Sequence, residues 1–250
     1  MKTEVTRQST TSEPKSHFVL VHGAWHGAWC WSSVIPLLRA QGHGVTAVDL
    51  PGRWREPSEL VGLTADDYVQ VVEQVLRSVD GPVVLVGHSL GGATISLAAE
   101  RVPDRVRRLI YLAAFLVPDG QTVGAIAGTD EHSTLSTLVR RDAGVSYVNP
   151  ERANQVLYHD CSEADTRVAH RLLCFEPSAM GQTPMRVTSE RFGRIPRAYI
   201  ECLQDRAISI NAQRAMQAVL PCNQVATMDT GHSPFISRPY ELAEILLQMR

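Results

Sequence analysis

The feature that most constrains the fold is the pentapeptide Gly87-His88-Ser89-Leu90-Gly91, between an apolar run at 83–86 and a helix-like stretch at 93–101. A G-x-S-x-G sequence between strand and helix is typical of a sharp turn that lifts the serine Oγ out of the sheet into a cleft. The serine of such a turn has a strained backbone, and glycine neighbours let strand and helix approach closely. The pattern predicts Ser89 as a nucleophile and the chain as a hydrolase.

The composition is that of a globular enzyme. The 250 residues, 44% hydrophobic and 20% charged, fit one domain with an insertion and are too apolar for disorder. A formal net charge of -2 gives no electrostatic reason to expect nucleic acid or an anionic membrane as a partner. Five cysteines at irregular spacing, with no C-x-x-C pair, argue against a disulfide framework or a zinc site and favour a reducing compartment.

No targeting signal is visible in the sequence. Residues 1–16 are polar and rich in Ser and Thr, without an apolar stretch that could form the core of a signal peptide. No run is long enough to span a bilayer. We therefore expect a disordered polar tail over 1–16 and a cytoplasmic protein.

The rest of the chain alternates between apolar runs typical of buried strands and stretches with helical spacing. Strands are predicted at 17–21, 45–50, 83–86, 106–113, 197–202 and 224–228, with helices between them. Six strands joined by helices predict an α/β fold, with a six-stranded, mostly parallel sheet that helices cover on both faces.

The alternation is interrupted over 121–193, where strand-like runs disappear and short helix signals take over. Asn149-Pro150-Glu151 and the pair Ser162 and Asp165 have the pattern of helix N-termini. We expect an all-helical cap over the carboxyl edge of the sheet, with the core formed by 17–120 and 194–250.

A serine needs a base and a group that orients this base. Among nine histidines, His232 follows the last predicted strand in a turn, where α/β sheets place their chemistry. The order serine, acid, histidine puts the acid between Ser89 and His232, and Asp205 follows the strand at 197–202. Alternatives stay open: Asp205 could cap a helix beginning near Ile208, and Asp119 is a rival acid. Asp229 is interpreted as a loop carboxylate.

Acyl transfer also requires backbone N–H donors for the developing oxyanion. One donor should be Leu90, directly after the nucleophile, and the other Ala24, in the loop after the first strand. For His22 and His26 in that loop we favour hydrogen bonding within the loop. Metal ligation is disfavoured because no third ligand is in view, so no metal is expected.

Taken together, these motifs resemble the branch of the α/β-hydrolase superfamily that contains plant methylesterases, salicylic-acid-binding proteins and hydroxynitrile lyases. The similar segments are 19–31, 45–50, 87–92, 112–115 with 118–119, and 190–193 with 199–200. The resemblance spans nearly the whole chain after the tail and is weakest in the cap. It implies an α/β-hydrolase fold, a triad of Ser89, Asp205 and His232, oxyanion donors at Ala24 and Leu90, no cofactor, and often a homodimer.

The branch contains two chemistries that two positions help to separate. Lyases of the rubber-tree type carry threonine where this chain has Gly23, and lysine where it has Ser233. Neither lyase-specific group is present, which favours ester hydrolysis. Two departures stand out: Gly231 occupies a position where many relatives have aspartate, and the stretch 52–56 differs from the plant pattern. For Arg53 and Trp54 in this stretch, two alternatives stay open: they line the site, or they face solvent.

The expected substrate is a small, fairly apolar ester in a pocket beneath the cap. Its expected lining residues are Gly23, Trp25, His88, Phe115, Phe175 and Ser233, with Phe235 as a further candidate. The leading function is serine-dependent carboxylic ester hydrolysis through an acyl-enzyme. The alternatives are lyase, lactonase or cyclase chemistry in a small-molecule pathway, or a non-catalytic ligand receptor on the same scaffold.

Overall fold

The computed structural model describes residues 15–250. The predicted disordered tail falls mainly on 1–14, which lie outside the described residues. Ser16, assigned to that tail, is 7% exposed, and its backbone N–H donates to His43 Nδ1 at 3.0 Å. Ser16 is therefore part of the packed structure, and the tail cannot extend to this residue.

The main sheet has six strands in the order β2-β1-β3-β4-β8-β9, and every pair is parallel. The strands are β1 His17–Val21, β2 Gly44–Val48, β3 Val83–His88, β4 Val106–Leu112, β8 Arg197–Cys202 and β9 Gln224–Met228. The predicted α/β-hydrolase architecture with a six-stranded parallel sheet is confirmed. Since the strands are parallel, their carboxyl ends meet at one edge, where the loops after β1, β3, β8 and β9 lie together.

Helices cover both faces of the sheet because successive strand residues point to opposite sides. In β1, Val19 and Val21 pack with α3 Ala65–Ser78, α4 Gly91–Arg101 and α10 Ile210–Val219. Phe18 and Leu20 pack on the other face, with α1 Val34–Ala40 and α12 Pro239–Gln248. Burial on both faces explains why the strands read as continuous apolar runs.

Several predicted helix starts are present in the structure. Thr64 and Asp67 form a capping box at α3. Asn149 caps α7 Pro150–Val156, and Ser162 caps α8 Glu163–Leu172. Each of these side chains accepts a backbone N–H that the first helical turn leaves without a partner, so the local sequence alone specifies the helix start.

The insertion at 121–193 is not all-helical, and this part of the prediction was wrong. It contains β5 Val139–Asp142, β6 Val145–Val148 and β7 Glu176–Pro177 in a three-stranded antiparallel sheet. A two-residue turn joins β5 to β6, with φ of 45° at Ala143 and 83° at Gly144. Such turns favour a tight hairpin. The strands escaped prediction because β5 carries the charged run Arg140-Arg141-Asp142 and β7 is two residues long.

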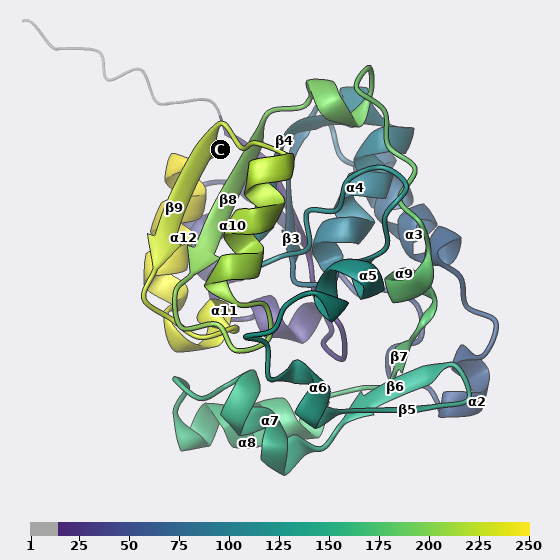
Figure 1. The fold of residues 1–250 in the computed structure, drawn as a ribbon. Coiled ribbons are helices and arrows are strands. Elements are labelled where there is room, and N and C mark those ends of the chain that lie inside the picture. Colours follow the sequence, from purple (N-terminus) through teal and green to yellow (C-terminus); the bar gives the residue numbers. More distant parts are fainter. Residues whose placement is uncertain (1–14) are drawn as a thin grey trace, which may run out of the picture.

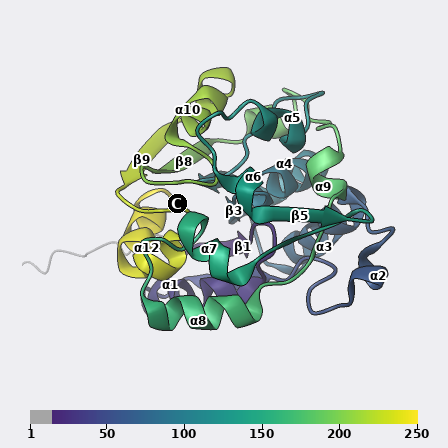
Figure 2. The same cartoon turned by 60° about the horizontal axis from the view of Figure 1, so that its bottom comes forward.

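The helices of the insertion are α5 Val123–Gly128, α6 Leu135–Leu138, α7, α8 and α9 Ala179–Gln182. The short elements outside it are α2 Pro57–Leu60, α11 Pro234–Ser237 and the 3-10 helices at Ala28–Trp31 and Pro103–Arg105. A further 3-10 helix, Phe192–Arg194, spans the end of the insertion. In Figure 1, α6, α7, α8 and the small sheet of β5–β7 lie below the main sheet, whereas α5 and α9 lie beside the core. Figure 2 shows α6, α7 and β5 in front of β1 and β3. A third apolar cluster joins the insertion to the core, with Trp25 and Ala207 from the loops against Leu138 and Tyr158.

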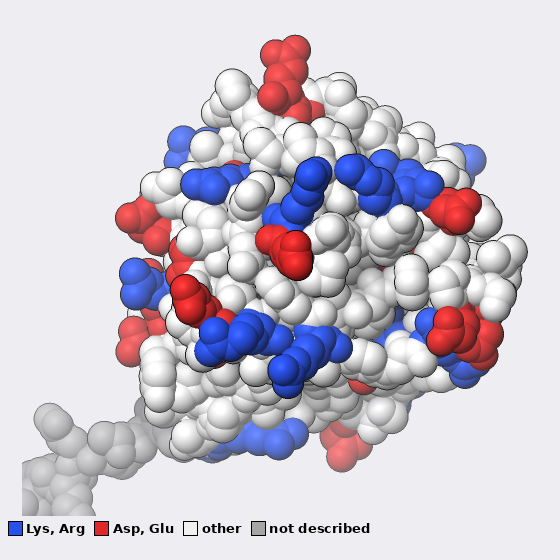
Figure 3. Space-filling model, turned by 90° about the horizontal axis from the view of Figure 1, so that it is seen from below, with Lys and Arg blue, Asp and Glu red and all other residues white. Residues whose placement is uncertain are grey.

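Basic and acidic side chains are interspersed over the face seen from the insertion side, without a broad area of one sign (Figure 3). Within residues 15–250, no helix combines the length and the apolar character that a membrane span requires.

Candidate active site

The sharp turn at residues 87–91, called the elbow below, places Ser89 at the end of β3 and just before α4. Ser89 has a φ of 51°, a left-handed conformation that is rare for a residue other than glycine. Its backbone is held from both sides: its N–H donates to the Leu112 carbonyl at 3.3 Å, and its carbonyl accepts the Phe115 N–H at 3.0 Å. A Cβ at Gly91 would lie 2.6 Å from the His22 carbonyl oxygen. Gly91, the second glycine of the motif, is therefore required because α4 closely approaches the loop after β1, called the oxyanion loop below.

The loops after β8 and β9 bring Asp205 and His232 together. His232 Nδ1 lies 2.7 Å from Asp205 Oδ2, and both side chains are buried. The other carboxylate oxygen accepts the backbone N–H groups of Ala207 and Ile208 at 2.7 and 3.0 Å. An ionised carboxylate can only accept, so this contact puts the proton on Nδ1 and leaves the His232 Nε2 lone pair free.

His88, the residue before Ser89, connects the elbow to the histidine loop. Its Nε2 lies 2.8 Å from the His232 carbonyl oxygen, and the two rings are 4.5 Å apart between centroids. Burial, and then the neighbouring His232, lower the pKa of His88 well below its usual value. His88 is therefore a neutral hydrogen-bond donor that holds His232 beside the elbow.

The alternative acids have other partners. Asp119 is exposed and accepts the Val187 N–H at 3.0 Å, while Asp229 is exposed and accepts the Gln204 side-chain amide at 3.0 Å. The helix after β8 is capped by Ser209, whose Oγ accepts the Ala212 N–H. Asp205 thus organises the turn before α10 with one oxygen and contacts His232 with the other.

The loop after β1 passes directly over Ser89. A Cβ at Gly23 would lie 2.7 Å from Ser89 Cβ, so only glycine allows this approach. Ala24 and Leu90 both line the cavity that contains Ser89. Throughout residues 15–250, neither of their backbone N–H groups donates to a protein acceptor, which leaves both available to an oxygen in the cavity.

The two histidines of this loop make structural hydrogen bonds. His22 Nδ1 contacts the Gly23 carbonyl and its Nε2 accepts the Leu50 N–H. His26 contacts the Ala24 carbonyl through Nδ1 at 2.8 Å and the Tyr158 hydroxyl through Nε2 at 2.7 Å. Burial lowers the pKa of His26 to about 4. Within the described part of the chain, no group of three or more His, Cys, Asp and Glu side chains is placed to hold a metal ion.

The Ser89 cavity has a volume of about 270 Å³ and lies between the elbow and the insertion. Its walls are mostly apolar, with a few polar groups. The lining residues are Ala24, Trp25, Ser89, Leu90, Phe115, Val123, Gly124, Ala127, Leu135, Arg141, Ser146, Glu176, Pro177, Ser178, Gly181 and Gln182. Trp25 and Phe115 of the expected set are among them.

The other expected pocket residues lie elsewhere. His88 and Ser233 are fully buried, and Gly23 is buried against Ser89 behind the cavity wall. Phe175 lines a separate cavity of about 320 Å³, where its ring packs against Tyr147. Phe175 directly precedes Glu176 in an extended segment, where neighbouring side chains point in opposite directions. Because Glu176 lines the Ser89 cavity, Phe175 points away from it.

Phe235, the further candidate, is also absent from the cavity. It is fully buried with its ring 4.8 Å from that of His88 and 5.3 Å from that of Trp31. It supports the site from the side of α1 and α12.

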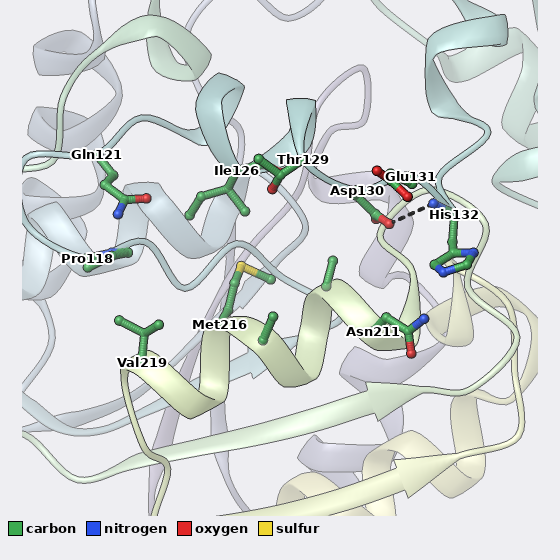
Figure 4. Close-up of a pocket in the computed structure, with 12 residues that line it drawn as sticks. Pro118, Gln121, Ile126, Thr129, Asp130, Glu131, His132, Asn211, Met216 and Val219 are labelled. Atoms are coloured by element: carbon green, nitrogen blue, oxygen red, sulfur yellow. Dashed lines mark hydrogen bonds between the residues drawn. The ribbon is translucent and has the colours of Figure 1, made fainter.

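A third cavity, of about 360 Å³, lies between α5 and α10. Figure 4 shows Gln121, Ile126 and Thr129 on one wall and Asn211, Met216 and Val219 of α10 on the other. None of the predicted site residues lines it. The Asp130 carboxylate, which also lines this cavity, accepts hydrogen bonds from the N–H and Oγ–H of Ser209. It therefore stabilises the N-terminus of α10, where Ser209 is the N-cap.

Sequence reasoning missed the charged pair beneath the site. Arg53 and Glu176 form a buried ion pair with a 2.8 Å contact, and Glu176 lines the Ser89 cavity. Arg53 was expected either to line the site or to face solvent, but it does neither: it is buried and is not among the residues that line the Ser89 cavity. No local signal marks Glu176. Trp54, the next residue along, is 56% exposed.

Comparison with known proteins gives the family. A family model described as the alpha/beta hydrolase family matches residues 18–245. Methylesterase 2 of Arabidopsis thaliana is 36% identical over 253 residues, covering 93% of this chain and 95% of that protein. Salicylic acid-binding protein 2 of Nicotiana tabacum is 31% identical over 252 residues, covering 93% and 96%.

A solved structure, that of a pyrethroid hydrolase from Sphingobium faniae JZ-2, superimposes with a TM-score of 0.85 at 31% identity and covers 94% of this chain and 97% of its own. With the fold and these relatives, the chain belongs to the α/β-hydrolase family. Within that family it falls in the methylesterase branch, which confirms the resemblance, and it is an enzyme of the esterase type.

Proposed function

We propose that this enzyme is a serine-dependent carboxylic ester hydrolase that acts on a small, fairly apolar ester through an acyl-enzyme. The observation that carries the proposal is the buried 2.7 Å contact between Asp205 and His232, which His88 holds beside the Ser89 elbow. The methylesterase relatives support the same chemistry.

Acylation follows from the roles of these groups. His232 Nε2 removes the Ser89 hydroxyl proton, and Oγ attacks the ester carbonyl. The carbonyl oxygen becomes negative and accepts hydrogen bonds from the free N–H groups of Ala24 and Leu90. Asp205 stabilises the imidazolium form of His232. His232 then returns the proton to the alkoxy oxygen, the C–O bond breaks, and alcohol leaves with the acyl group on Ser89.

Deacylation repeats these steps with water as the nucleophile. His232 removes a proton from water, and the resulting hydroxide adds to the acyl carbon while the same two N–H groups bind the oxyanion. Collapse breaks the bond to Ser89 Oγ, His232 returns the proton to the serine, and the acid is released. The reaction needs no group beyond those of the chain and one water.

The substrate class follows from the cavity. About 270 Å³ of mostly apolar space suits an acyl group of modest size. The relatives named as methylesterases suggest a small alcohol, so we propose a methyl ester of a compact, apolar acid. The absence of threonine at position 23 and of lysine at 233 supports hydrolysis over cyanohydrin cleavage.

Incubation of the purified enzyme with p-nitrophenyl acetate, a panel of methyl esters and mandelonitrile tests the proposal. We expect acid release from the esters and none of the cyanide that lyase chemistry would release from mandelonitrile. Cyanide release without ester turnover would make the enzyme a lyase. Ligand binding by calorimetry without turnover of any compound would instead indicate a receptor.

Gly23→Ala is expected to lower kcat by about 100-fold. The added Cβ would lie 2.7 Å from Ser89 Cβ, so the oxyanion loop or the elbow must move, and a displacement of about 1 Å at a reacting centre costs about 10²-fold. Steady-state kinetics on p-nitrophenyl acetate measures the effect. Gly128→Ala is the matched control, because a Cβ there has nothing within 4 Å. A Gly23→Ala enzyme with wild-type kcat would contradict the proposed loop position.

A further inference from the structure

Two charged residues that the mechanism does not use lie beneath the oxyanion loop. Arg53 follows β2 in the core, and Glu176 lies in β7 of the insertion, yet their side chains meet at 2.8 Å and are 2% and 4% exposed. Hydrogen bonds to the remaining donors and acceptors of a buried ion pair offset the cost of burying its charges. Here Arg53 Nε is buried without a partner, but the other polar atoms of the pair have one. The partners of these two groups therefore show what the pair holds in place.

The Glu176 carboxylate contacts three parts of the molecule. Oε2 accepts from Arg53 Nη2 and, at 3.1 Å, from the backbone N–H of Trp25. Oε1 accepts from the Tyr68 hydroxyl of α3 at 2.7 Å. One contact therefore goes directly to the backbone of the residue that follows Ala24, the proposed oxyanion donor.

Arg53 holds the same loop one residue further along. Its Nη1 donates to the His26 carbonyl at 2.9 Å, and its Nη2 also donates to the Tyr68 hydroxyl at 2.7 Å. The pair thus binds the loop on both sides of Trp25, at an N–H and at a carbonyl. A single lysine ammonium could not reproduce this planar fork, since its donors radiate from one point.

The loop needs such support because its conformation is unfavourable. Trp25 has a φ of 61°, a left-handed conformation that is unfavourable for a bulky residue and persists only where its surroundings impose it. Its indole Nε1 donates to Ser146 Oγ of β6 at 3.1 Å, a second contact from the insertion. The turn at Trp25 fixes the peptide that joins Ala24 to Trp25. Through the backbone of Ala24 it also restrains the next peptide back, which carries the Ala24 N–H.

Arg53 keeps its charge in this buried environment, and Tyr68 keeps its proton. Burial is the largest single effect and would lower the pKa of Arg53, but Glu176, Tyr68 and Cys174 together raise this pKa above the usual value. Burial, followed by the carboxylate, raises the pKa of Tyr68 well above its usual range. Arg53 is therefore cationic and Tyr68 a neutral donor at all ordinary pH values.

We propose that Arg53 and Glu176 are positioning residues for the oxyanion hole: they hold the backbone at Trp25 and His26 so that the Ala24 N–H faces the Ser89 cavity. This inference rests on the proposed ester hydrolysis. Since Glu176 belongs to the insertion, the geometry of the oxyanion hole depends on how the insertion is seated on the core.

Three variants separate positioning from mere structural support. Arg53→Met and Glu176→Leu each leave one buried charge unpaired, so both Tm and kcat should fall. The double variant replaces the pair with apolar groups of similar size, which is often neutral for stability. We expect its Tm to exceed those of both single variants, since no buried charge is left unpaired. Its kcat should stay about 100-fold below wild type, with KM within about threefold, since Trp25 N–H still lacks its acceptor. Wild-type kcat in the double variant would overturn the proposal.

Arg53→Lys keeps the test decisive if those variants fail to fold, because it retains the charge. We expect kcat to fall about tenfold and the affinity for a trifluoromethyl ketone, whose serine adduct carries an oxyanion, to fall in proportion. The Kd of the ester in the Ser89→Ala background should stay constant. Arg55→Lys is the control, since Arg55 is 61% exposed. Equal ketone affinity in Arg53→Lys and wild type would overturn the proposal.

If the proposed ester hydrolysis is wrong, the wild-type enzyme will turn over no ester, and this result is distinct from any effect of the Arg53 and Glu176 variants. Hydrogen exchange at the Trp25 amide then tests the pair on its own. Faster exchange in Arg53→Lys than in Arg55→Lys would support the positioning of the loop, and equal exchange would contradict it.

Discussion

Ser89→Ala should lower kcat for ester hydrolysis by about a millionfold, the loss expected when the nucleophile is removed from a triad whose members act as a unit. The methyl side chain cannot form the acyl-enzyme, and only the oxyanion donors and substrate binding remain. Stability should change little, because the left-handed backbone at residue 89 is held by the hydrogen bonds to Leu112 and Phe115, which alanine preserves.

The measurement combines steady-state kinetics with labelling by a fluorophosphonate, which reports an activated serine independently of the substrate. Ser32→Ala is the matched control, since it makes the same change at an exposed serine outside the cavity. We expect normal labelling and a kcat within about threefold for the control. Ester turnover near the wild-type rate in Ser89→Ala would refute the assigned nucleophile.

Asp205→Asn should lower kcat by about 10⁴-fold, as removal of the acceptor charge does in triads of this kind. The amide keeps one oxygen, and the N–H groups of Ala207 and Ile208 retain it as their acceptor. The NH₂ group then faces His232 Nδ1 and donates to it, so the proton moves to Nε2. A histidine in this tautomer cannot accept the Ser89 proton, although the fold is intact.

Kinetics at saturating ester and a thermal melt check this expectation together. Asp229→Asn supplies the control, because this exposed carboxylate lies after the neighbouring strand and contacts only Gln204 among the described residues. A loss below about tenfold in Asp205→Asn, at unchanged Tm, would mean that another group orients His232. A large loss in Asp229→Asn would point to that carboxylate instead.

The sheet could be predicted from the sequence because its strands are buried on both faces. Runs such as 17–21 and 83–86 are continuous and apolar, and helix starts such as Thr64 and Asn149 carry their own capping chemistry. The structure of the insertion was harder to predict from the sequence. The hairpin of β5 and β6 carries charged, exposed residues and depends on pairing partners, which periodicity does not report.

The lining of the pocket was the part that the sequence predicted least well. Trp25 and Phe115 lie in the cavity wall, whereas Phe175 and Phe235 pack elsewhere. An aromatic side chain suits a core as well as a cavity, so its residue type does not indicate which one it lines. The Arg53–Glu176 pair joins residues 123 positions apart, and no local pattern specifies such a contact.

The sequence by itself determined the family, the parallel sheet and the candidate nucleophile, acid and base, because each depends on local patterns or on chain order. The tertiary structure alone decided which carboxylate meets His232, which side chains enclose the cavity, and which charges hold the oxyanion loop. Those features are distances between segments far apart in the chain, and packing of the whole molecule sets them.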